Sequence, residues 1–255
     1  MQHAGVYIRV IRDPASKSDM VRKINLRKTL ARWLRSRVFA ALYRSAAASL
    51  VLTIAAHAQD IHQLAHSVDD HYNHLRSLQT DFKEIYRGEG MERIESGTLW
   101  LKKPRKMRWE YRSPKEKLFV SDGNNVWFYL PAERQLRKTQ FKKLDDLRSP
   151  IAFLLGKTKL ENELQGLSKA SDQAPMSSGN TLLRGVPKAM ADRLSEVMLE
   201  ITPTNQIARI VLTEVDGAVT EFQFSDPKED TELADSRFKF TPPPGVETIE
   251  GDLGQ

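Results

Sequence analysis

Four strand-like runs between Ser96 and Leu130 constrain the fold of this chain more than any other feature. Three of its four tryptophans lie in them. Turn residues between aromatic and β-branched segments are typical of an antiparallel meander. The last run is apolar at every position, so apolar groups are expected to cover both of its faces. The runs are Gly97–Leu101, Met107–Arg112, Leu118–Val120 and Val126–Leu130.

The motifs of the chain follow a specific order. G-x-L-W-x-K-K-P occupies residues 97–104, V-S-D-G residues 120–123, W-F-Y residues 127–129, and F-x-F-x-P-P-x-G-V residues 238–246. In this order they resemble the periplasmic outer-membrane lipoprotein carrier (LolA) family, and the resemblance extends from Ile61 to Val246. The motifs are specific as an ordered set and weak individually.

The resemblance implies a mainly β (α+β) fold, a half-closed antiparallel β-barrel of about 10–11 strands with a lid of two or three α-helices. It also implies a periplasmic carrier that binds the acyl chains of lipoproteins in a hydrophobic cavity. Such a carrier receives acylated lipoproteins from an inner-membrane ABC-type exporter and delivers them to an outer-membrane acceptor. We expect a monomer that binds no nucleic acid.

The first 58 residues are predicted to be a cleavable export signal. A basic region lies between Arg22 and Arg37, and Ser45–Ala56 is apolar and rich in small residues. Ala56-His57-Ala58 then matches a small-x-small cleavage pattern. The apolar run has 12 residues, whereas a helix that spans a bilayer needs about 20, which argues against a membrane anchor. We expect cleavage after Ala58, with Met20 as an alternative start.

The leader accounts for the basic charge of the chain. Residues 1–58 carry a net +9 and the whole chain +6, which leaves −3 for the single carrier domain expected over residues 59–255. The basic isoelectric point is therefore no evidence for nucleic-acid binding. Residues 102–143 carry +9 and residues 196–252 carry −9. Two solvated faces of opposite sign are the favoured interpretation, and electrostatic docking to partners is the alternative.

Cysteine is absent from the chain. An exported domain without disulfides depends on its apolar core, and residues 59–255 are numerous enough to form one. A bacterial lipoprotein needs a cysteine directly after its signal, so we expect a protein that is free in the periplasm.

Apolar periodicity predicts two helices outside the meander. Ile61, Leu64 and Val68 belong to a helical repeat over Asp60–Leu78. The second helix begins at Ser149-Pro150 and stops before Gly156. Its five residues 151–155 are all apolar, so it must pack on several faces, and the resemblance makes it part of the lid.

Alternation and turn residues predict further strands before and after the meander. Asp216-Gly217 is the expected turn of the last hairpin. The predicted strands are Asp81–Arg87, Gln135–Thr139, Thr181–Arg184, Glu196–Thr202, Ile207–Val215 and Val219–Phe224.

Enzyme signatures are missing from the sequence. It has no G-x-S-x-G, phosphate-loop, G-x-G-x-x-G or H-E-x-x-H motif. Residues 75–255 contain neither His nor Cys, which removes His-dependent triads and Cys nucleophiles from the strand-rich region. Carboxylate pairs such as Glu196/Glu200 are expected on solvated faces. We therefore predict a protein that is not an enzyme, with no catalytic residue and no cofactor.

One histidine pattern allows a metal interpretation. His62, His66, Asp70 and His74 repeat every four residues and form one stripe on a helix. His pairs at this spacing can bind Zn²⁺. The stripe is predicted to face solvent without supporting ligands, so a polar helix face is favoured and no metal site is predicted.

The aromatic strands allow two interpretations. Aromatic side chains dominate protein cores and need no further role. Strands that are apolar on both faces, together with an all-apolar helix, favour a cavity for acyl chains, and the family resemblance carries most of that interpretation. The candidate lining residues are Trp100, Met107, Trp109, Tyr111, Trp127, Phe128, Ile151, Phe153, Leu154, Leu155, Leu199 and Ile201.

The resemblance also implies a latch. In the family, a basic residue before the motif proline hydrogen-bonds towards the lid helices and holds the empty form shut. The matching residue here is Lys103, where the family usually has arginine. Lysine cannot make the planar bidentate contacts of arginine, and an exposed turn lysine is the alternative interpretation.

Other functions remain open. A lipid-sensing periplasmic regulator of envelope stress has a related fold joined to a second domain, and carriers of other lipids share the same features. A hydrolase that uses carboxylates is disfavoured because His and Cys are absent from residues 75–255.

Overall fold

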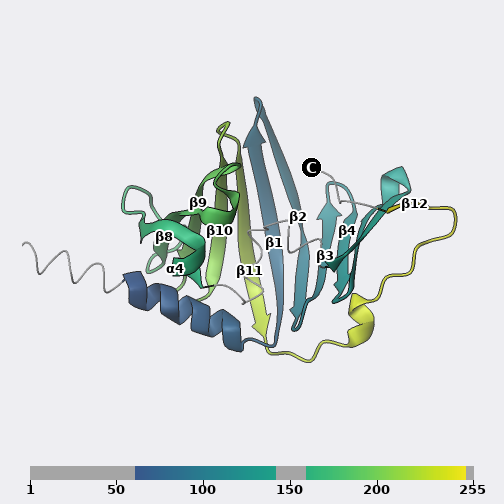
Figure 1. The fold of residues 1–255 in the computed structure, drawn as a ribbon, viewed down its shortest axis with the longest axis horizontal. Coiled ribbons are helices and arrows are strands. Elements are labelled where there is room, and N and C mark those ends of the chain that lie inside the picture. The colour runs from purple at the N-terminus through teal and green to yellow at the C-terminus, as the bar shows by residue number, and fades with distance from the viewer. Residues whose placement is uncertain (1–60, 142–158, 251–255) are drawn as a thin grey trace, which may run out of the picture. The chain divides into compact units, whose positions relative to one another are not determined.

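The computed structural model describes residues 61–141 and 159–250, which form one predominantly β unit (Figure 1). Its strands form a single sheet in the order β12-β6-β5-β4-β3-β2-β1-β11-β10-β9-β8-β7. Neighbouring strands are antiparallel except β12 and β6, which are parallel. No ladder joins β12 to β7 within the described residues, so the sheet is open there. The predicted fold class, a mainly β half-closed barrel, is confirmed.

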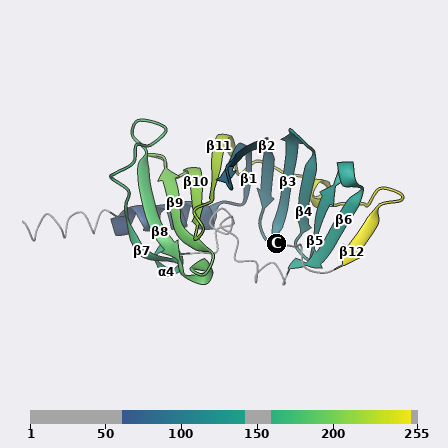
Figure 2. The ribbon, with the colours of Figure 1, turned by 90° about the horizontal axis from the view of Figure 1, so that it is seen from above.

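The aromatic meander is present as predicted. Figure 2 shows its strands side by side in one row with those of the second half. The meander consists of β1 (Ser77–Gly88), β2 (Met91–Lys102), β3 (Lys106–Ser113), β4 (Lys117–Asp122), β5 (Asn125–Leu130) and β6 (Gln135–Gln140). The remaining strands are β7 (Leu164–Lys169), β8 (Thr181–Pro187), β9 (Leu194–Ile201), β10 (Ile207–Glu214), β11 (Val219–Glu229) and β12 (Glu247–Glu250).

The sheet has 12 strands, more than the 10–11 expected, because two short strands carry weak signals. β7 contains Gly166 with a φ of +68° and pairs with β8 through a register shift, so its alternation is broken. All four residues of β12 are exposed. Pairing with β6, which is distant in sequence, makes β12 a strand.

A helix covers residues 61–74, shorter than the Asp60–Leu78 predicted. The correction has a tertiary cause, since Ser77 and Leu78 pair with Lys102 and Leu101 of β2. The first strand consequently begins at Ser77, four residues before the predicted Asp81. The apolar residues at this junction fit both the helical and the strand repeat, and pairing with β2 makes them part of a strand.

The main hydrophobic core lies on one face of the sheet, which we call the inner face. The helix over residues 61–74 contributes Ala65, Val68 and Tyr72 to it. The meander contributes Leu99 and Trp109 among others, and β8 to β10 supply Leu183, Leu199 and Ile210. Residues of both halves of the sheet therefore share one core with the helix.

The opposite, outer face of the meander is covered by the C-terminal segment, residues 230–246. Figure 1 shows this segment in yellow, running from the end of β11 to the short helix η4 (Asp235–Phe238) and on to β12. Leu233 and Phe238 bury Trp100 in a second cluster. Lys102 and Lys106 bind the Asp235 carboxylate at 2.7 and 2.8 Å, so part of the opposite charge of the two regions is paired internally.

Three other short helices occur within residues 61–141 and 159–250: η1 (Pro131–Glu133), α4 (Leu160–Glu163) and η3 (Lys188–Met190). Among the described residues, no helix is both long and apolar enough to cross a bilayer. The predicted lid helix around residues 150–155 and the predicted leader lie outside the described residues.

Candidate functional site

Cross-strand pairing builds an apolar row on the inner face of the meander. Leu99 lies opposite Trp109, Trp109 opposite Phe119, and Phe119 opposite Phe128. Residues directly opposite each other project from the same face of a sheet. Leu99 and Trp109 belong to the main core, so the whole row from β2 to β5 faces inward.

Aromatic rings extend this row towards the second half of the sheet. The ring of Trp109 lies 5.1 Å from that of Phe82 on β1 and 5.5 Å from that of Phe222 on β11, both edge to face. Phe82 also contacts Tyr111 at 4.9 Å. Edge-to-face pairs are a favourable aromatic geometry, and together they form an apolar floor across β1, β3 and β11.

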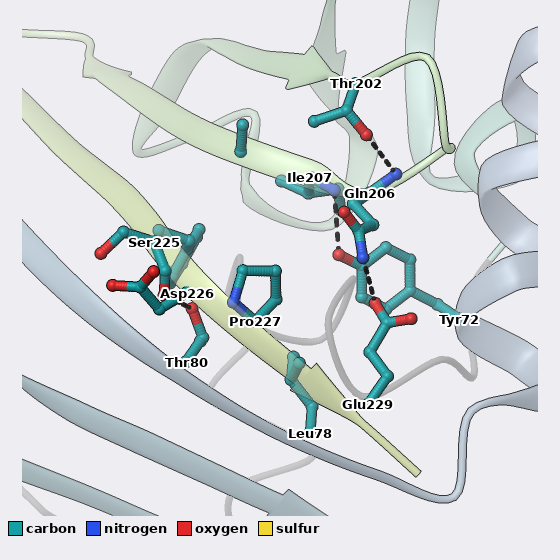
Figure 3. Close-up of a pocket in the computed structure, with 12 residues that line it drawn as sticks. Tyr72, Leu78, Thr80, Thr202, Gln206, Ile207, Ser225, Asp226, Pro227 and Glu229 are labelled. Carbon is teal, nitrogen blue, oxygen red and sulfur yellow. Dashed lines mark hydrogen bonds between the residues drawn. The ribbon is translucent and has the colours of Figure 1, made fainter.

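A cavity of about 240 Å³ lies between β1, β10, β11 and the helix over residues 61–74. Figure 3 shows Tyr72, Leu78, Gln206 and Glu229 among its lining residues. Phe224 is also in the lining and is the cross-strand partner of Phe82, so the cavity adjoins the aromatic floor. Apolar walls with a few polar groups are typical of ligand sites.

The helix over residues 61–74 is attached to the sheet beside this cavity. The backbone N–H of Ile207 donates a hydrogen bond to the Tyr72 hydroxyl at 2.9 Å (Figure 3). Burial raises the pKa of Tyr72, so its hydroxyl stays neutral. Gln206 donates to the Glu229 carboxylate at 2.8 Å, and His71 contacts the same oxygen at 3.0 Å.

The helix also holds the segment that leads into β7. Both carboxylate oxygens of Asp69 accept a hydrogen bond from the Leu160 N–H, at 3.1 and 3.0 Å. Leu160 itself is buried in the main core. Burial raises the pKa of Asp69, and this hydrogen bond opposes the shift.

Lys103 lies at the C-terminal end of the same helix. Its ammonium donates hydrogen bonds to the carbonyl oxygens of Tyr72 and of Asn73, the latter at 3.0 Å. The last carbonyls of a helix lack partners within the helix and carry partial negative charge. A lysine here is therefore a favourable cap for the helix. Whether this contact works as a latch stays a prediction.

The structure divides the predicted lining residues into three groups. One group projects from the inner face: Met107, Trp109, Tyr111, Phe128, Leu199 and Ile201. Trp100 and Trp127 project from the outer face. The third group, Ile151, Phe153, Leu154 and Leu155, lies outside the described residues.

The two outer-face tryptophans are covered by the C-terminal segment. Trp100 is 8% exposed, and the Arg237 guanidinium lies 4.8 Å from its ring centroid. Phe240 contacts Trp127 at 6.2 Å and Tyr129 at 5.6 Å between ring centroids. Phe240 therefore covers the outer face of Val126–Leu130, where an apolar group was expected. Trp100 and Trp127 are not part of the lining that we propose.

The sequence interpretation missed the cavity residues Tyr72, Leu78, Ala208 and Phe224. The sequence could have indicated Tyr72 and Phe224, because both belong to apolar repeats of predicted elements. Ala208 carried none, since its role depends on where the helix over residues 61–74 packs.

The histidine stripe makes separate local contacts. His66 pairs with Asp70 at 3.1 Å, His74 contacts the Asp70 carbonyl oxygen at 2.8 Å, and His62 contacts Glu161. Within the part of the chain that the structure describes, no three side chains of His, Asp or Glu are placed to hold a metal ion.

An open sheet with an apolar inner face and a cavity beside a packed helix is the arrangement of a protein that binds apolar ligands. Comparison with known families agrees with this class. The family model described as outer membrane lipoprotein carrier protein LolA matches residues 73–241. The chain belongs to this family, as its motifs predicted.

Two sequence relatives support the assignment. An outer-membrane lipoprotein carrier protein of Chromobacterium violaceum is 31% identical over 69% of this chain and 82% of its own length. One of Nitrosospira multiformis is 28% identical over 78% and 93%. An uncharacterized conserved protein from Thermus thermophilus, a solved structure, is 16% identical over 74% and 98%, with a TM-score of 0.49. The family assignment rests on the sequence matches.

Proposed function

We propose that this protein is a periplasmic carrier that binds the acyl chains of lipoproteins against its inner face. The observation that carries the proposal is the cavity lined by Leu78, Ala208 and Phe224, next to the aromatic floor, in a chain of the LolA family. We further propose that Met107, Trp109, Tyr111, Phe128, Leu199 and Ile201 line the acyl site.

The proposed role is binding rather than catalysis. Its partners are acylated lipoproteins, an inner-membrane exporter that supplies them and an outer-membrane acceptor that receives them. The predicted leader over residues 1–58 supports export, and residues 59–255 form the proposed carrier domain. The relatives' name, outer-membrane lipoprotein carrier protein, supports lipoproteins as the cargo.

A carrier must also release its cargo, which limits how tightly it can hold acyl chains. Each buried CH₂ contributes about 0.8 kcal/mol, so complete burial of several long chains would exceed the practical affinity ceiling of about 18–21 kcal/mol. A small cavity beside a helix that is held by core packing and a few polar contacts fits partial burial. We expect the contacts of Lys103 and the Tyr72–Ile207 hydrogen bond to govern how readily the helix over residues 61–74 opens.

The test uses diphenylhexatriene, a fluorescent hydrocarbon without polar groups. The purified protein should take up this probe, and a synthetic triacylated lipopeptide should displace it. Ala208→Phe fills the cavity and should lower probe occupancy severalfold. Ala174→Phe is the matched control, because Ala174 is exposed in the loop before β8. A folded protein that took up no probe would contradict the proposal.

A further inference from the structure

Four ionisable side chains lie together towards one end of the inner face, where Arg93 also pairs with Glu95 at 3.5 Å. Glu84 and Glu95 are directly opposite each other on β1 and β2, and Tyr111 and Lys117 on β3 and β4. Core residues two positions earlier on β1 and β3 project inward, so Glu84 and Tyr111 do too. Glu95 is only 4% exposed. We call these four residues the polar cluster.

The members of the polar cluster bind one another. The Tyr111 hydroxyl donates a hydrogen bond to Glu84 Oε2 at 2.7 Å, and the Lys117 ammonium donates to Glu95 Oε2 at 2.7 Å. The Lys117 ammonium also lies 5.1 Å from the centroid of the Tyr111 ring. Burial raises the pKa of Glu84, while the hydrogen bond from Tyr111 opposes that shift.

Stability alone does not explain this arrangement. Like charges directly opposite on neighbouring strands are unfavourable. A buried ion pair is on average no more stabilising than well-packed apolar residues of the same size. A family that binds apolar chains has every physical reason to keep this face apolar, so the polar cluster points to a polar part of the ligand.

A backbone irregularity in β2 positions Tyr111 in the polar cluster. The ladder between β2 and β3 shifts register between Ser96 and Gly97, and Gly97 is the partner of Tyr111. A Cβ atom on Gly97 would lie 1.8 Å from the carbonyl oxygen of Glu110. Only glycine permits this close approach, and a bulge of this kind redirects nearby side chains.

Hydrogen-bonding capacity remains for a ligand. An ammonium has three donors, and the Lys117 ammonium contacts both oxygens of Glu95, at 2.5 and 2.7 Å, which leaves one donor. Within the described residues, Glu84 Oε1 accepts no hydrogen bond. A donor beside an acceptor matches an amide group, which carries both an N–H and a C=O.

We propose that the polar cluster binds the amide- and ester-bearing junction where the acyl chains of a lipoprotein join its polypeptide. The inference rests on the proposed carrier function and assigns a direction to the cargo. The acyl chains lie along the aromatic floor towards the cavity beside Tyr72. The polypeptide leaves at the end of the sheet that holds Glu84 and Lys117.

The test compares two ligands that differ in polar groups. Diphenylhexatriene reports the apolar site alone, and a triacylated lipopeptide reports the apolar site together with the junction. Tyr111→Phe removes one hydroxyl and should weaken lipopeptide binding about threefold to tenfold, the effect of a lost hydrogen bond. The affinity for diphenylhexatriene should fall less than that for the lipopeptide, because the substitution keeps the Tyr111 ring that lines the acyl site. Tyr129→Phe is the matched control, because Tyr129 projects from the outer face against Phe240.

A second variant keeps the result interpretable. Lys117→Met should weaken lipopeptide binding about tenfold or more, because a charged donor is lost, with folding checked by circular dichroism. Equal loss of both ligands in Tyr111→Phe, or unchanged lipopeptide affinity in both variants, overturns the inference while leaving the carrier function standing. A wild-type protein that binds neither ligand overturns both.

Discussion

The Lys103 ammonium lies 3.0 Å from the carbonyl oxygen of Asn73, at the end of the helix that borders the cavity. It donates to the Tyr72 carbonyl as well. Lys103→Met removes both hydrogen bonds and the favourable charge at this helix end. We expect the free energy of unfolding to fall by about 1–2 kcal/mol. We also expect faster uptake of diphenylhexatriene, because the helix opens more often.

The measurements are a thermal melt and stopped-flow fluorescence. Lys115→Met is the matched control, since Lys115 is exposed in the turn between β3 and β4 and should change neither quantity. Lower stability with unchanged uptake would show that Lys103 caps the helix without acting as a latch.

The C-terminal segment contributes to stability through Phe238. This side chain is 1% exposed and packs with Trp100 and Leu233. Phe238→Ala leaves a void against Trp100 and should lower the free energy of unfolding by about 3–5 kcal/mol, measured by urea denaturation. Met176→Ala is the control, because Met176 is 46% exposed and its loss should cost less than about 0.5 kcal/mol. A cost for Phe238→Ala no larger than that of the control would show that the segment is loosely attached.

The meander could be predicted because its signals are local. Turn residues such as Pro104, Pro114 and Gly123 separate aromatic runs, and each run is long enough to define a strand. Short turns between adjacent strands also leave few alternative registers. Family membership was predictable for the same reason, because its motifs lie in this contiguous block and at one C-terminal site.

The division of apolar surface between the two faces was not predictable in the same way. The sequence favoured a cavity lining for Trp100 and Trp127 over a plain core role, whereas both contact the C-terminal segment on the outer face. Their alternation with Leu99 and Val126 was visible in the sequence. The identity of the covering residues was not, because Phe238 and Phe240 are more than 100 residues distant. The cavity beside Tyr72 depends on helix packing, which no local pattern encodes.

Glu200 and Arg209 form an ion pair on the outer face, with Oε2 and Nη2 2.8 Å apart. The Glu200 side chain has no exposed surface. Removing one member of a buried pair leaves the other charge uncompensated. Arg209→Met should therefore lower the free energy of unfolding by about 3–5 kcal/mol in urea denaturation. A cost below about 1 kcal/mol would mean that Glu200 is sufficiently compensated by its other hydrogen bonds.

A second substitution isolates the charge. Glu200 Oε1 accepts hydrogen bonds from the Met176 N–H and the Asn180 amide, both at 2.8 Å. Glu200→Gln keeps an acceptor for these groups and removes the negative charge. Combined with Arg209→Met, it should recover part of the lost stability. A double variant less stable than Arg209→Met alone would assign the cost to packing of the arginine stem rather than to charge.

Asp235 makes the attachment of the C-terminal segment sensitive to acid. Hydrogen bonds from Lys102 and then Lys106 lower the pKa of Asp235 from 3.8 to about 2. A carboxyl group whose pKa is depressed by folding stabilises the folded state above its unfolded pKa. That contribution is lost as the pH falls through the folded pKa. For Asp235 the window therefore runs from 3.8 down to about 2.

The difference in melting temperature between the wild type and Asp235→Asn reports this contribution. We expect a constant difference above about pH 4 that shrinks as the pH falls towards about 2. High salt should reduce it, because Asp235 is exposed and its ion pairs are screened. Asp192→Asn, at an exposed aspartate, should show no such trend. A difference that persisted unchanged to pH 2 would mean that the Asp235 contacts with Lys102 and Lys106 do not depend on its charge.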